Sequence, residues 1–86
     1  MVKVDFKKIP IRDIEGHEIT ADFRKQIGNQ LYMQGKNIEE CELGKRIYFA
    51  EEPVSLSDTD IQAVISIINN YGYVARTSIE KCLKTE

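Results

Sequence analysis

The spacing of apolar residues changes once along the chain, near residue 20, and this change limits the folds that the chain can adopt. Before it, apolar and polar residues alternate, and Val2, Val4 and Phe6 fall on one face of an extended segment. After it, apolar residues recur every three or four positions, which is the period of an amphipathic helix. Strands followed by helices predict an α+β fold, with a small N-terminal antiparallel ribbon and three to four helices packed on one face.

The predicted β-ribbon covers residues 2–20 and contains a hairpin. Pro10 interrupts the first alternating run, because proline cannot donate a hydrogen bond to a sheet ladder. The hairpin follows this proline, and Gly16 supplies the positive φ that a short turn requires. In this arrangement Ile14 and Ile19 are expected to face the core.

Four helices are predicted after the ribbon, within a single domain that spans the chain from residue 1 to residue 86. The helices cover about residues 21–34, 38–49, 57–70 and 74–84. Thr20 is the expected cap of the first helix. Gly28 within that helix costs about 1 kcal/mol relative to alanine, which indicates that another part of the chain packs closely against it. Ser57 and Asp60, at the start of the third helix, are typical of a capping box.

The residue types present favour a non-enzymatic protein. The chain has one His and two Cys. Histidine is the usual general base, but His17 falls in the predicted hairpin turn, where an exposed side chain is expected. Cys41 and Cys82 lie far apart, so a zinc site with four ligands is not expected. The glycines form no phosphate-binding motif, and neither a cofactor nor a metal is expected.

Charge and hydropathy indicate which class of partner and which cell compartment to expect. The chain has 12 Lys and Arg against 14 Asp and Glu, a formal net charge of -2, whereas nucleic-acid-binding proteins usually carry a basic surface. No run approaches the roughly 18 apolar residues of a membrane span. The first residues alternate and carry charge, unlike the continuous apolar core of a signal peptide. We therefore expect a cytoplasmic protein that binds other proteins or copies of itself.

A candidate protein interface combines an acidic middle segment with tyrosines. Residues 37–62 contain seven Asp and Glu against two Lys and Arg, which suits either a solvated helix face or contact with a basic partner. Tyrosines near helix ends either pack on the core with the hydroxyl in water or form a contact patch. The candidate interface residues are Tyr32, Tyr48, Glu39, Glu42, Tyr71 and Tyr73.

A different interpretation concerns DNA. Residues 63–83 resemble the first two helices of a winged-helix domain, in which a helix ends in a glycine–aromatic–apolar turn and a second helix opens with small polar residues. This resemblance implies a DNA-binding regulator, with Arg76, Lys81 and Lys84 as the nucleic-acid contacts. The third helix of that family, which reads the major groove, has no counterpart here, and three basic residues release few counterions.

Short motifs between residues 9 and 65 carry a second resemblance. They are DIEGH at 13–17, ADFRK at 21–25, GNQLY at 28–32, LGKRIY at 43–48 and LSD at 56–58. In these motifs the chain is similar to small uncharacterised proteins encoded by phages and prophages, including those of Bacteroidales and Firmicutes. The resemblance implies an accessory protein in a bacterial host, with a role in virion assembly or self-association. It assigns no catalytic or binding residue.

Overall fold

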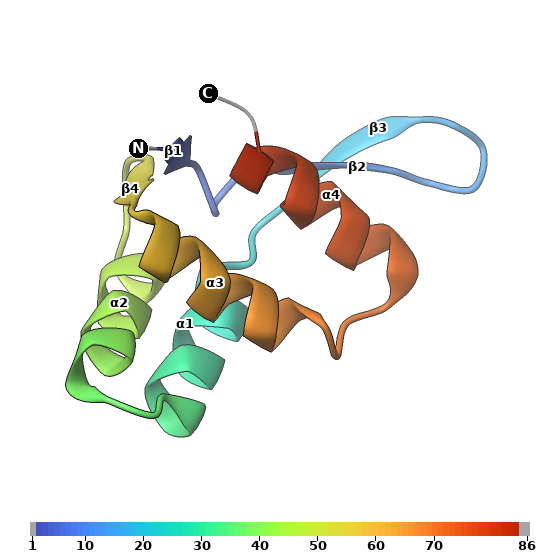
Figure 1. Cartoon of the computed structure of the whole chain (residues 1–86). Helices are drawn as coiled ribbons and strands as arrows, with labels where there is room; N and C mark the ends of the chain where they lie inside the picture. The colour runs from blue at the N-terminus through green and yellow to red at the C-terminus, as the bar shows by residue number, and fades with distance from the viewer. Residues whose placement is uncertain (1, 85–86) are drawn as a thin grey trace.

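Eight strands and helices form within residues 2–84, the part of the chain that this computed structural model describes (Figure 1). In chain order they are β1 (Val2–Val4), β2 (Ile9–Arg12), β3 (Glu18–Ala21), α1 (Arg24–Gln34), α2 (Ile38–Tyr48), β4 (Val54–Leu56), α3 (Asp58–Ile68) and α4 (Tyr73–Lys84). The predicted α+β class, with an N-terminal hairpin and four helices, is confirmed. None of the helices in the described residues is long and apolar enough to cross a membrane.

The strands form two separate antiparallel pairs. β2 pairs with β3 in the predicted hairpin, whereas β1 pairs with β4, which follows the first two helices in the sequence. Val2 lies opposite Leu56 and Val4 opposite Val54, and all four side chains are buried. β4 is not predicted from the sequence, because a strand of three residues is too short to show alternation.

The hairpin of β2 and β3 projects from the body of the molecule as an arm (Figure 1). At its base Ile9 is buried in the core, and β2 lies against α4. Ile14 in the turn and Ile19 in β3 are exposed, so the prediction that both face the core is wrong. Ile14 lies in the turn between the strands, where strand alternation does not set the direction of a side chain.

Two further predictions at this end of the chain are wrong. Pro10 does not interrupt the ribbon but lies inside β2, opposite Thr20. Both strands of an isolated hairpin are edge strands, where proline is tolerated. Thr20 therefore belongs to β3 and does not cap α1, which begins at Arg24 rather than at residue 21. The Asp22 carboxylate accepts hydrogen bonds from the guanidinium and the backbone N–H of Arg24, and these bonds lower the pKa of Asp22.

The buried apolar side chains form a cluster between the helices and the pair of β1 and β4. Its fully buried members are Val4, Phe6, Ile9, Ile27, Leu31, Leu43, Ile47, Leu56, Val64, Ile68 and Ile79. The predicted capping box of α3 is confirmed, because Ser57 Oγ accepts from the Asp60 N–H and an Asp60 carboxylate oxygen accepts from the Ser57 N–H. With the core on their inner side, α1 and α2 present their other side to solvent.

Candidate functional site

Two glycines allow the backbones of α1 and α2 to touch. A Cβ atom added to Gly28 would lie 2.8 Å from the carbonyl oxygen of Gly44, and one added to Gly44 would lie 2.7 Å from the carbonyl oxygen of Gly28. Real Cβ atoms do not approach other atoms this closely, so each position requires glycine. The close packing predicted at Gly28 is confirmed, and the structure identifies Gly44 as its partner.

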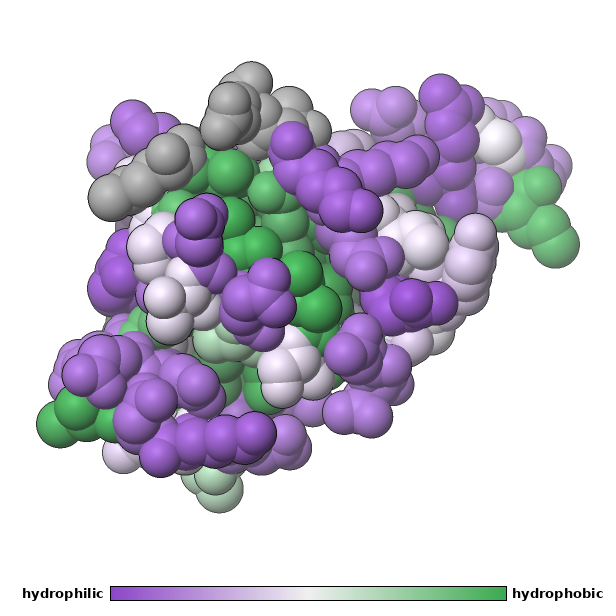
Figure 2. All heavy atoms as spheres, viewed as in Figure 1, coloured by the Kyte–Doolittle hydropathy of each residue, from purple (hydrophilic) through white to green (hydrophobic). Residues whose placement is uncertain are grey.

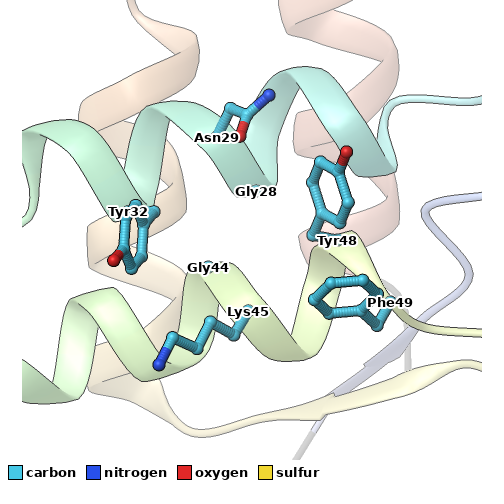
Figure 3. Close-up of a pocket in the computed structure, with 7 residues that line it drawn as sticks. All are labelled: Gly28, Asn29, Tyr32, Gly44, Lys45, Tyr48 and Phe49. Atoms are coloured by element: carbon cyan, nitrogen blue, oxygen red, sulfur yellow. The ribbon is translucent and has the colours of Figure 1, made fainter.

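The absence of side chains at this glycine contact leaves a hollow of about 310 Å³ on the outer side of the helix pair (Figure 3). The residues that line this aromatic groove are Gly28, Asn29, Tyr32, Gly44, Lys45, Tyr48 and Phe49. Its volume is at the lower end of the range of small-molecule sites. The groove therefore has room for one or two side chains of a partner.

Aromatic rings form both ends of the groove. The Tyr32 side chain projects from α1 on one side of the glycine contact, and the Tyr48 side chain projects from α2 on the other side (Figure 3). The ring of Phe49 packs edge-on against that of Tyr48, with 4.8 Å between the ring centroids. Tyr32 is 50% exposed and Phe49 is 73% exposed. Much of the aromatic surface is thus in contact with water although it surrounds a concave site.

Charged groups occur on the rim of the groove. The Lys45 ammonium lies 5.8 Å from the centroid of the Tyr32 ring, within the range of a cation–π contact. The same ammonium lies 3.8 Å from the Glu42 carboxylate. Lys45 is the only charged residue among those described as lining the groove, and Glu42 lies beside it at the rim.

The structure divides the predicted interface residues among three places. Tyr32 and Tyr48 line the aromatic groove, and Glu42 is at its rim. Glu39 lines a different hollow, between the start of α2 and the start of α3. Tyr71 and Tyr73 lie in and after the turn between α3 and α4, away from the groove. The groove thus brings together half of the residues predicted for a single interface.

Tyr71 has a structural position. Its hydroxyl donates a hydrogen bond to the side-chain oxygen of Gln30 on α1, and its ring stacks on Phe23 with the centroids 6.3 Å apart. Burial raises the pKa of Tyr71 to about 12. Tyr73 is exposed and lies under the Arg76 guanidinium, 5.7 Å from ring centroid to Arg Cζ. Tyr71 therefore links α1 to the α3–α4 turn.

The residues predicted to contact nucleic acid all lie on α4. Arg76 is half-buried beside Tyr73, while Lys81 and Lys84 are exposed. Lys81 also lines a hollow between α4 and the hairpin arm, in which Arg12 adds a cation and Glu18 a carboxylate. The three side chains are thus spread along one helix, with the hairpin beside it.

Phe49, Asn29 and Lys45 belong to the groove but were not among the predicted interface residues. A signal for the groove is nevertheless present in the sequence. The spacing Gly-x-x-x-Tyr occurs twice, as Gly28 with Tyr32 and as Gly44 with Tyr48. Residues four apart share a helix face, so each helix presents a glycine and a tyrosine together. Only the pairing of the two helices shows that these faces meet.

Within residues 2–84 no group of three or more His, Cys, Asp and Glu side chains is arranged to hold a metal ion. His17 is exposed in the hairpin turn, as predicted, and its Nδ1 lies 3.4 Å from the Asp13 carboxylate. The chain matches no protein-family model, no curated protein and no solved structure. The geometry of the groove is therefore the main guide to function.

Proposed function

We propose that this protein acts as a non-enzymatic binding module, which takes an apolar side chain of another polypeptide into the aromatic groove between α1 and α2. The observation that supports this proposal is the concave cluster of Tyr32, Tyr48 and Phe49 around two glycines. Aromatic residues are enriched in protein interfaces, and buried anchors in such pockets contribute most of the binding energy.

The chemistry of the groove specifies the kind of segment that it binds. The floor is glycine backbone and aromatic ring, which favours an aliphatic side chain. Lys45 is the charged residue that lines the groove, which favours a carboxylate beside that side chain. A short segment with an aliphatic residue next to Asp or Glu therefore suits both features.

Selection of binders from a displayed library of random peptides tests this proposal. We expect the selected peptides to carry an aliphatic residue next to an acidic one, and their amide chemical-shift changes to map to α1 and α2. Phe49→Asp should weaken their binding at least about tenfold, because it places a charge in the apolar site. Ile38→Asp is the matched control, since Ile38 is 71% exposed on α2 but does not line the groove.

Equal binding of the peptides to wild type and to Phe49→Asp would contradict the proposal. A second contrary result concerns the DNA-binding interpretation. Duplex DNA that binds with a steep dependence on salt, and that is released by Arg76→Ala and Lys81→Ala, would favour a regulator that uses α4. The proposed binding depends on the groove alone and makes no use of the resemblance to phage and prophage proteins. That resemblance stays a prediction.

A further inference from the structure

The most exposed large apolar side chain in the described residues is at the end of the hairpin arm. Ile14 is 103% exposed. Figure 2 shows apolar atoms that stand out from the polar surface at the free end of this arm. Ile14 stands free at the end of the arm, with its whole surface available to a partner.

The turn holds Ile14 in a defined position. The Gly16 N–H donates to the Asp13 carbonyl (3.0 Å), and Gly16 has a φ of 88°, as in a three-residue hairpin loop. The Asp13 carboxylate also accepts hydrogen bonds from the backbone N–H groups of Glu15 and His17, at 3.0 and 2.8 Å. The backbone of such a preorganised turn loses little conformational entropy when the turn binds.

The hairpin tip, residues 13–17, also carries the charge that the groove favours. Glu15 is adjacent to Ile14, and Glu18 follows the tip in β3. The tip thus has the composition that we derived for the occupant, which is an aliphatic side chain next to a carboxylate. Lys45 at the rim of the groove is the complementary cation.

The tip cannot fill the groove of its own molecule. In Figure 1 the free end of the arm and the pair of α1 and α2 are at opposite ends of the molecule. The molecule measures 41 Å along its longest axis, against 24 and 21 Å along the others. The arm is tied at its base by the buried Ile9 and cannot fold back over this distance. Contact between tip and groove therefore requires two copies of the chain.

We propose that Ile14 of one copy inserts into the aromatic groove of a second copy, with Glu15 beside Lys45. This inference rests on the proposed function, since it names the partner of the same groove. One such contact leaves a free groove on one copy and a free tip on the other. These two either pair with each other, which gives a reciprocal dimer, or bind further copies in a head-to-tail chain or ring.

Sedimentation velocity on purified protein tests this arrangement. We expect the wild-type chain to form larger species as its concentration rises. Ile14→Asp and Phe49→Asp should each weaken this association at least about tenfold, while Ile38→Asp assembles like the wild type. All three residues are exposed, so the variants are expected to fold, which circular dichroism would verify.

Mixing the two defective variants gives the decisive result. The Ile14→Asp variant keeps an intact groove and the Phe49→Asp variant keeps an intact tip. An equimolar mixture should therefore form a dimer of one copy of each and no larger species. An interface in which the same surface of both copies meets itself would not recover in this way, because one of the two surfaces in every mixed pair would carry a defect.

A charge exchange provides an independent test. Glu15→Lys and Lys45→Glu should each weaken assembly, and the double variant should recover part of the loss, since the two charges again attract. Assembly of Ile14→Asp like the wild type, or a wild type that remains monomeric at near-millimolar concentration, would overturn the inference. If the selected peptides still bind the groove in that case, the proposed function stands with another protein as partner.

Discussion

The pair of α1 and α2 and the hairpin arm use the same residue types in opposite ways. Ile47 on α2 is fully buried, whereas Ile14 in the arm is fully exposed. Gly28 is required because a neighbouring backbone touches it, whereas Gly16 has open space around it and is required for its positive φ. The helix pair is thus held by packing and the tip of the arm by its own hydrogen bonds. Only a region of the second kind can extend away from the core.

The largest expected difference between the two regions comes from isoleucine truncation. Ile47→Ala should reduce the free energy of unfolding by about 2–5 kcal/mol, because it leaves a cavity in the core. Ile14→Ala should change it by no more than about 0.5 kcal/mol, as for other surface sites. Urea denaturation of the monomer measures both values. Similar losses for the two variants would show that the arm packs on the body in solution.

Glycine replacement tests the contact between the two helices. Gly28→Ala should reduce the free energy of unfolding by about 1–3 kcal/mol, because the added methyl group meets the backbone of α2. This overpacking outweighs the gain in helix propensity. Gly72→Ala is the control, because nothing lies within 4 Å of the position where its Cβ would be. Gly72→Ala should reduce the free energy of unfolding by less than about 1 kcal/mol. Thermal unfolding of both variants gives the comparison.

Replacement of the turn glycine should have a local effect. Gly16→Ala forces a residue with a Cβ atom into positive φ, which costs about 1 kcal/mol. The cost should appear as faster amide hydrogen exchange in β2 and β3, with exchange in α1 and α2 unchanged. Gly16→Asn should exchange like the wild type, since asparagine tolerates this conformation. Faster exchange throughout the chain would show that the arm and the helices unfold together.

Within the packed region we also expect a loss of stability at high pH. The pKa of Tyr71 is about 12 in the folded protein, against an ordinary value of 10.0. Because the folded value is the higher one, the stabilisation is complete below pH 10.0 and is lost as the pH rises toward 12. Thermal melts should show this decline, and Tyr71→Phe should reduce it. An unchanged decline in the variant would assign it to other groups.

The central part of each helix could be predicted well from the sequence, because helix periodicity and caps are local properties. The stripe through Ile61, Val64 and Ile68, together with the box of Ser57 and Asp60, locates α3 within a residue or two. The turn at Gly16 could be predicted for the same reason. By contrast, the prediction for Ile14 failed because its exposure depends on the distance between the arm and the body.

The candidate groove could be predicted only in part. Tyr32, Tyr48 and the close contact at Gly28 were identified from one helix at a time. Phe49 is not predictable as a groove residue, because the sequence places it in the last turn of a helix over 38–49 whereas it caps α2, and only the pairing of the helices brings its ring beside Tyr48. Residue type alone groups Tyr71 and Tyr73 with the groove residues, although the fold separates them from the groove.

The sequence by itself determined which segments are helices, where the cap of α3 and the hairpin turn lie, and which apolar faces need a partner. Tertiary structure alone decided that β1 pairs with β4, that Gly28 meets Gly44, and that Ile14 stands clear of the core. The physical reason is the range of the interactions. Caps, turns and helical stripes depend on residues a few positions apart, whereas contacts between distant segments depend on how all the faces pack at once.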